Sequence, residues 1–218
     1  MASDGKLGLF FEGQRMHFAV LVILLAAVWE LSGLAGFGAG EFLGLSTMGW
    51  VALSVGDAVL HQVYVWLCWR AELHGQTLSR WFGPKAFTLY AVLFTALFAA
   101  RPILAFALGW SNRGTLDIHP WAGWGIALVL FLPAVYLMIS IRRYFSFRRA
   151  FGIDHFEPGY RSLPMVRDGI FRFSPNAMYV FGFFMLWVPA FLFQSMAAMV
   201  IAAFSHAYIW VHYYATEK

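Results

Sequence analysis

The sequence predicts an all-α fold, a polytopic bundle of membrane-spanning helices. Of its 218 residues, 61% are hydrophobic and only 12% are charged, and the mean hydropathy of +0.67 lies well outside ordinary soluble usage. Crossing the hydrocarbon core of a bilayer takes about 20 consecutive apolar residues, and the chain contains several runs of that length. We expect about six spans, the last two forming a hairpin, with both termini in the cytoplasm.

The apolar runs define these spans one by one. Four of them have the length of a single crossing and cover residues 17–37, 48–69, 86–109 and 121–141. A further region, 178–215, is nearly twice as long, so it is expected to form two helices that turn near Gln194-Ser195. The first run is too long for a secretory signal and lacks a small-residue cleavage site, so we expect it to remain as a span.

The basic residues predict the orientation of the bundle, because Lys and Arg collect in cytoplasmic loops. Every second predicted loop is basic, and the segment 142–177 carries most of the arginines. This pattern puts that segment and both termini on the cytoplasmic side, and we expect a bacterial inner membrane with the active site facing the cytoplasm. The net charge of +4 then faces anionic lipid headgroups and indicates no nucleic-acid partner.

Nothing divides the chain into separate domains. It has no Ser/Gly linker, low-complexity tract or internal repeat, so residues 1–218 are expected to form a single domain. The one long polar segment, 142–177, is interspersed with Phe and Tyr residues, which disfavours disorder. We expect it to fold against the bundle as a cytoplasmic cap.

Ionisable side chains within a predicted span are costly and usually face the bundle interior. Glu30 lies within the first span. In the second span, four polar residues share one helical face at spacings of four, three and four: Asp57, His61, Tyr64 and Cys68. Asp57 and His61 are interpreted as a buried polar pair that joins helices. No two ligands stand at a diagnostic spacing for a metal, so none is expected, although Glu30, Asp57, His61 and His206 are possible ligands.

The last span repeats this pattern near the carboxy terminus. One helical face there is expected to carry His206, Trp210, Tyr213 and Glu217, again at spacings of four, three and four. His212 and Tyr214 lie off that face, and we interpret them as residues of an ordinary interfacial belt.

The most distinctive motif is DGIFRFSPNAMYVFG, from Asp168 to Gly182, directly before the predicted hairpin. It resembles the signature of the integral-membrane methyltransferases that include phosphatidylethanolamine N-methyltransferases and isoprenylcysteine carboxyl methyltransferases. That signature has a glycine, an aromatic residue and an arginine, then Arg-His/Asn-Pro-x-Tyr opening a hydrophobic hairpin, and an acidic pair after it. The motif aligns with this signature without a gap, and the resemblance covers residues 164–217.

Individual positions of the motif both match and depart from the family pattern. The matching residues are Gly169, Phe171, Arg172, Asn176, Tyr179 and, for the acidic pair, Glu217. The departures are Pro175 at the second basic position, Ala177 at the proline, Gly182 one place late, and Lys218 as the second member of the acidic pair.

The resemblance implies S-adenosylmethionine as methyl donor, with Gly169 and Gly182 in its binding segment. A guanidinium suits the carboxylate of that molecule, which is the role assigned to Arg172, and Asn176 offers both a donor and an acceptor. Glu217 suits the ribose hydroxyls or the ammonium. Aromatic faces attract cations, so Tyr179 and Tyr213 are expected near the sulfonium or the adenine ring.

The acceptor implied by the resemblance is a membrane-resident lipid or isoprenoid. A phospholipid amine is preferred, and its proton would be taken by Glu30 or His206. The runner-up is an isoprenylcysteine carboxylate, which needs no base. A membrane reductase that uses NADPH and shares the same hairpin is a further alternative, and a noncatalytic scaffold or transporter is the third class.

Overall fold

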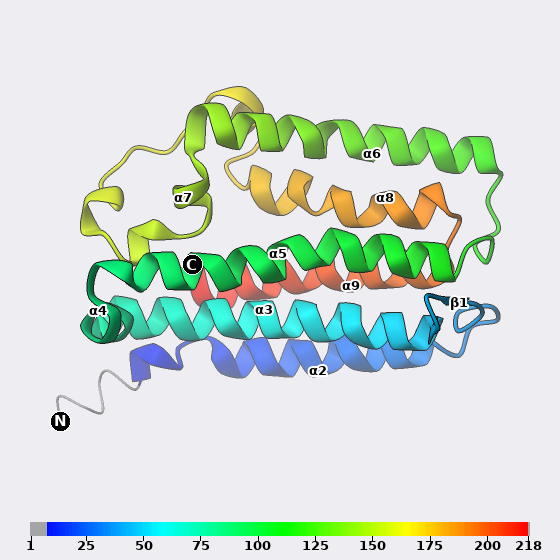
Figure 1. Cartoon of the computed structure of the whole chain (residues 1–218), viewed down its shortest axis with the longest axis horizontal. Helices are drawn as coiled ribbons and strands as arrows, with labels where there is room; N and C mark the ends of the chain where they lie inside the picture. The colour runs from blue at the N-terminus through cyan, green and yellow to red at the C-terminus, as the bar shows by residue number, and fades with distance from the viewer. Residues whose placement is uncertain (1–7, 218) are drawn as a thin grey trace.

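The computed structural model describes residues 8–217 and is a bundle of long helices that run along one axis (Figure 1). Its helices are α2 (Gln14–Leu31), α3 (Thr47–Gly75), α4 (Thr77–Phe82), α5 (Ala86–Ser111), α6 (Pro120–Ser140), α7 (Phe147–Ala150), α8 (Phe184–Leu192) and α9 (Met196–His212). A small antiparallel hairpin of β1 (Glu41–Phe42) and β2 (Leu45–Ser46) precedes α3. The prediction of a polytopic helical bundle is confirmed.

Within the described residues, five helical stretches are long and apolar enough to cross a membrane. They cover Gly8–Leu31, Thr47–Gly75, Thr77–Ser111, Pro120–Phe145 and Met196–Glu217. The fifth predicted span corresponds to a shorter apolar stretch, Met178–Leu192. At 1.5 Å per residue this stretch extends roughly 22 Å, less than the roughly 30 Å of the hydrocarbon core.

The predicted hairpin turn near Gln194-Ser195 is confirmed. The helix α8 ends at Leu192 and α9 begins at Met196. Between them Gln194 adopts a left-handed conformation with φ of 49°, which reverses the chain. The Ser195 side chain then caps α9 by accepting a hydrogen bond from the Ala198 backbone N–H at 3.1 Å.

Helix α8 lies between α6 and α5 (Figure 1) and contacts both. Helix α9 packs on α8, α3 and α2, while α3 also packs along α5. The carboxy-terminal hairpin is therefore the element around which the other spans assemble.

One buried asparagine ties the β1 end of the bundle together. Asn112 follows α5 and is completely buried. Its Nδ2 donates to three carbonyls of the loop after α2, those of Gly36 (2.8 Å), Phe37 (3.1 Å) and Ala39 (2.9 Å). Its Oδ1 accepts from Thr115 Oγ1 (2.7 Å), Ser195 Oγ (3.0 Å) and the Ala197 N–H (2.9 Å). This side chain thereby joins three segments that are distant in the sequence.

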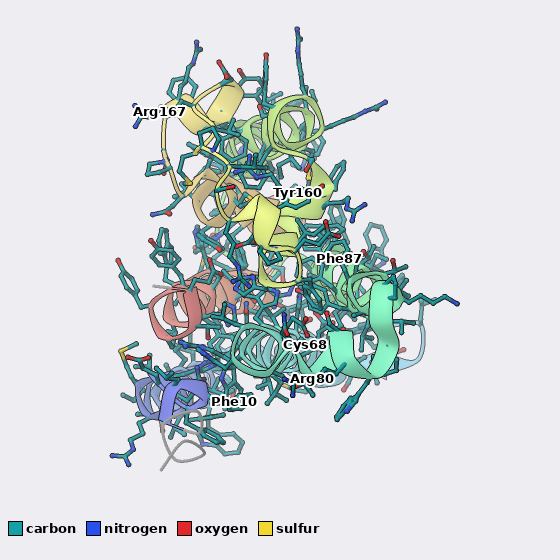
Figure 2. All side chains as sticks on the ribbon, turned by 90° about the vertical axis from the view of Figure 1, so that its left-hand side faces the viewer. Phe10, Cys68, Arg80, Phe87, Tyr160 and Arg167 are labelled. Atoms are coloured by element: carbon teal, nitrogen blue, oxygen red, sulfur yellow. The ribbon has the colours of Figure 1, made fainter. Side chains whose placement is uncertain are left out.

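At the opposite end, the segment after α6 lies across the mouth of the bundle. Seen from this end, the ribbon at Tyr160 stands in front of the bundle, between the α6–α8 pair and the α3–α5 pair (Figure 2). The His155 ring stacks on Trp69 of α3, with centroids 4.2 Å apart and an interplanar angle of 11°. The Phe151 ring lies 4.7 Å from that of Phe94 on α5.

A close backbone approach fixes the same contact. Gly152 has a φ of +81°, and a Cβ added there would lie 2.4 Å from the Trp69 ring. Phe156 completes the packing, with its ring 5.2 Å from that of Tyr90. Through Phe151, His155 and Phe156, the segment 142–177 thus packs on α3 and α5. We call this segment the cap.

Candidate functional site

A cavity of about 340 Å³ lies among the helices on the cap side of the bundle. Its wall is built by α3, α5, α6, α7, α8, α9 and the π-helical turns at the two ends of the hairpin, Met178–Gly182 and Tyr213–Glu217. Most lining side chains are apolar, and the ionisable ones are His61, Arg101, Tyr179, His212 and Glu217. This volume falls in the range of small-molecule sites, which typically combine an apolar wall with a few polar groups.

The two ends of the hairpin meet at this cavity. The Tyr179 hydroxyl, at the start of the hairpin, donates a hydrogen bond to Glu217 Oε2 at its end. The Tyr179 ring also contacts those of Tyr213 (5.4 Å) and Trp210 (5.9 Å). The structure therefore brings together three of the predicted cofactor residues, Tyr179, Tyr213 and Glu217.

The last turn of the chain is π-helical, which changes the face predicted from α-helical spacing. The turn spans Tyr213–Glu217, and π-helical hydrogen bonding joins residues five positions apart. As a result, Glu217 Oε1 lies 3.8 Å from His212 Nε2. The interpretation of His212 as a belt residue is wrong, because this side chain is 1% exposed and lines the cavity.

The amino-terminal helix holds this π-helical turn in place. Gln14 Nε2 lies 3.3 Å from the Ala215 carbonyl and 3.4 Å from Thr216 Oγ1 and donates to both. Gly13, with a φ of +76°, approaches the same carbonyl so closely that an added Cβ would lie 2.5 Å from it. The position of Glu217 thus depends on α2 as well as on α9.

A buried cation lies deeper in the cavity, and sequence reasoning missed it. Arg101 of α5 lines the cavity and is 9% exposed. Its Nε lies 3.7 Å from Asp57 Oδ2, and its Nη2 donates to the Ala58 carbonyl at 3.2 Å. The signal was an arginine within an apolar run, AARPIL, which by itself indicates an intramembrane functional group.

The expected pairing of Asp57 with His61 is wrong. Asp57 pairs with Arg101 across α3 and α5 instead. The His61 ring packs edge-on against Phe94 at 4.7 Å and lines the cavity. A buried polar pair does join two helices, but its second member comes from α5.

Four buried polar atoms of cavity-lining residues have no hydrogen-bond partner within residues 8–217. They are His61 Nδ1, Trp69 Nε1, Arg101 Nε and His212 Nδ1. Buried polar groups are almost always hydrogen-bonded in native proteins, so atoms of this kind fit a cavity that takes a polar ligand.

The remaining predicted cofactor residues lie at different distances from the cavity. Gly182 lines it, while Gly169 packs against α6, where an added Cβ would lie 2.6 Å from Ser140 Oγ. Arg172 is exposed, with its guanidinium over the Phe173 ring at 4.7 Å. The Asn176 carbonyl accepts the N–H of Tyr179 at 3.0 Å. The roles of Arg172 and Asn176 stay predictions.

Neither predicted base lines the cavity. Glu30 is exposed and precedes the last residue of α2, at the β1 end of the bundle. His206 accepts a hydrogen bond at Nδ1 from Trp187 Nε1 (3.2 Å) and stacks on Phe183. Among residues 8–217, no cluster of three or more His, Cys, Asp and Glu side chains is arranged to hold a metal.

The cap adds charge close to the hairpin ends. Partial burial acts to raise the pKa of the Asp154 carboxyl, but hydrogen bonding to His155 and the positive charges of His155 and Arg161 outweigh it and lower the pKa. Asp154 and His155 both interact electrostatically with Glu217. The cap therefore presents a carboxylate and an imidazole near the Tyr179–Glu217 pair.

Comparison with known proteins finds one family to which this part of the chain is similar. The family model described as phospholipid methyltransferase matches residues 123–218, a range that contains Tyr179, His212 and Glu217. A search of curated proteins and a search of solved structures gave no match. The match extends the predicted resemblance back into α6 and implies a methyltransferase that acts on a lipid in the membrane. The carboxy-terminal part of this chain, residues 123–218, is thus similar to the phospholipid methyltransferase family.

Proposed function

We propose that the protein transfers a methyl group from S-adenosylmethionine to the amine headgroup of a membrane phospholipid. The observation that carries this proposal is the Tyr179–Glu217 contact at the wall of a largely apolar cavity, inside the region that matches the family. A lipid acceptor suits the apolar wall, and a polar cofactor suits the side chains at the two ends of the hairpin.

The residues at the hairpin ends fit the groups of S-adenosylmethionine. This cofactor supplies the methyl group. The Glu217 carboxylate can accept hydrogen bonds from ribose hydroxyls or from the ammonium, and the Tyr179 and Tyr213 rings offer faces that attract a sulfonium. Arg172 and Asn176, which precede α8, remain candidates for the carboxylate at the mouth of the cavity.

Methyl transfer needs little from the protein beyond alignment of the reactants and exclusion of water. An amine must be neutral to attack, so a nearby group has to take its proton. His212 suits this role better than Glu30 or His206, because it lines the cavity and its Nε2 lies 3.8 Å from Glu217 Oε1. Here His212 would hold the proton and the Glu217 carboxylate would stabilise the imidazolium.

The cavity also offers a path for a lipid. Phe98 of α5 and Met138 of α6 line the cavity and are 44% and 39% exposed, respectively. Helix α8 lies between α5 and α6 (Figure 1) and contacts both, and these exposed cavity-lining side chains belong to the two helices that flank it. Their exposure supports lateral entry of the lipid between α5 and α6. The basic residues Arg80 and Arg167 lie at the cap end (Figure 2), which supports a cytoplasmic orientation of that end.

The test is a methylation assay with the purified protein in lipid nanodiscs, using radiolabelled S-adenosylmethionine and phosphatidylethanolamine. We expect labelled mono- and dimethylated lipid with the unchanged protein. Glu217→Gln and Tyr179→Phe should lower the rate by about 10-fold or more, as loss of a charge-assisted hydrogen bond does. Glu157→Gln, in an exposed ion pair with Arg148, is the matched control and should leave the rate unchanged.

The alternatives give different results in the same preparation. Calorimetric titration with S-adenosylmethionine should show binding, and titration with NADPH should show none; the reverse result would favour the reductase. Methylation of an isoprenylcysteine in place of the phospholipid would favour the carboxyl methyltransferase. Full activity of an Arg172→Ala/Glu217→Ala double variant would overturn the assignment of the site.

A further inference from the structure

We propose that Arg101 binds the phosphodiester of the acceptor lipid, one helical turn deeper in the bundle than the Tyr179–Glu217 pair. This inference rests on the proposed function and names the group by which the acceptor is recognised. It adds Arg101 as the specificity-determining residue and His61 as a second donor to the same anion.

The bonding of Arg101 leaves donors available for a ligand. A guanidinium has five N–H donors, and in this protein Nη2 donates to the Ala58 carbonyl, while Nε has no hydrogen-bond partner within residues 8–217. The contact with Asp57 Oδ2 is 3.7 Å long, beyond the range of a hydrogen bond. Burying a cation with so few hydrogen bonds costs free energy unless a further group accepts hydrogen bonds from its remaining N–H donors.

The geometry aims this cation at the cavity. Arg101 and His61 line the cavity, whereas Asp57 is not among the lining residues of the described chain. Asp57 therefore balances the charge of Arg101 from the side facing away from the cavity, and the remaining N–H donors of the guanidinium are available to a ligand in the cavity. His61 Nδ1, which is also without a partner within residues 8–217, can donate to the same ligand.

The depth of Arg101 matches the dimensions of a phospholipid headgroup. The Arg101 guanidinium lies over the Phe183 ring at 5.7 Å, and Phe183 is four residues beyond Tyr179, about one helical turn or roughly 5 Å further along the hairpin. In an ethanolamine headgroup, two carbons and one oxygen separate phosphorus from nitrogen, a span of about 5 Å at roughly 1.5 Å per bond. A phosphate at Arg101 therefore sets the amine at the level of the Tyr179–Glu217 pair.

The same arrangement accounts for the direction of the lipid. The acyl chains then run from the phosphate toward the apolar wall formed by Phe98, Pro102 and Met138, where the cavity meets the bilayer. The amine points toward the cap. An acceptor whose single anionic group is itself the methylated carboxylate gains nothing from Arg101, so this site discriminates in favour of phospholipids.

The experiment compares two acceptors with identical acyl chains, phosphatidylethanolamine and a diacyl lipid amine that lacks the phosphate. The unchanged protein should show a KM about 10- to 100-fold lower for the phosphate-containing acceptor, the range that charge-assisted hydrogen bonds supply. The variant Asp57→Asn/Arg101→Gln removes both charges at nearly constant volume and so leaves no unpaired buried carboxylate. In this variant the two KM values should become equal, while the Kd for S-adenosylmethionine stays unchanged.

Controls separate this inference from folding and from the proposed function. Arg113→Gln alters an exposed arginine that stacks on Trp110 just after the same helix, and it should keep the preference of the unchanged protein. Arg101→Lys, which keeps the charge, should retain part of the preference. A preference that survives in Asp57→Asn/Arg101→Gln, or that is lacking in the unchanged protein, would overturn the role of Arg101. Failure of the unchanged protein to methylate either amine would instead refute the proposed function.

Discussion

Truncation of Asn112 provides the sharpest test of how the bundle is held together. In Asn112→Ala, most former partners keep another hydrogen bond. The Gly36 carbonyl still accepts the Ala39 N–H, and the Ala39 carbonyl still accepts Thr47 Oγ1. The Phe37 carbonyl and the Ala197 N–H have no other partner within residues 8–217. Each buried group left without a hydrogen bond costs about 1–3 kcal/mol, so these two groups should lower the free energy of unfolding of the variant by about 2–6 kcal/mol.

The assay is thermal unfolding in detergent, followed by tryptophan fluorescence. For a chain of this length the loss corresponds to a decrease in Tm of about 4–24 °C. The control is Ser32→Ala, which removes an exposed hydrogen bond to the Trp29 carbonyl and should change Tm by less than about 2 °C. Because Asn112 lies at the end of the bundle opposite the cap, methyl transfer well below Tm should persist. A Tm for Asn112→Ala equal to that of the control would refute the reasoning.

Three further predictions concern the site itself. Gln14→Leu should loosen the last π-helical turn and raise the Kd for S-adenosylmethionine by about 10-fold, corresponding to loss of about one buried hydrogen bond; calorimetric titration measures this, and an unchanged Kd would contradict the anchoring by α2. Gly152→Ala should displace the cap, because its Cβ would collide with Trp69, and cost about 1–3 kcal/mol; Gly159→Ala, where an added Cβ meets nothing within 4 Å, is the control, and equal Tm values would contradict the prediction. His212→Asn should lower kcat by about 100-fold or more with little change in the Kd for S-adenosylmethionine; a kcat close to that of the unchanged protein would exclude a proton-accepting role.

Most of the fold could be predicted from the sequence because hydropathy determines where a chain can cross a membrane. The second predicted span, 48–69, lies within α3, and the turn at Gln194-Ser195 separates α8 from α9 as expected. The helix geometry of the fifth span could not be predicted. Hydropathy and the polar pair Gln194-Ser195 indicate where residues 178–215 divide, but composition does not show that the first turn, Met178–Gly182, is π-helical.

The site was predictable only where it depends on the motif or on helical spacing. The meeting of Tyr179 with Glu217 follows from a hairpin whose ends return to the same side of the bundle. The position of His212 was not predictable, because α-helical spacing sets it off the face of Glu217, whereas the final turn is π-helical. The partner of Asp57 lies on another helix, and sequence spacing says nothing about pairs between helices.

The shortness of the hairpin's first helix has a consequence for the surrounding bilayer. The stretch Met178–Leu192 extends roughly 22 Å, which is shorter than the hydrocarbon core. The bilayer beside α8 is therefore expected to become locally thinner, at a modest cost in free energy per ångström of mismatch. Membranes made of shorter acyl chains reduce that cost. The thickness of the host membrane is therefore expected to affect this protein directly at α8, which lies between the two helices, α5 and α6, where we propose that the lipid enters.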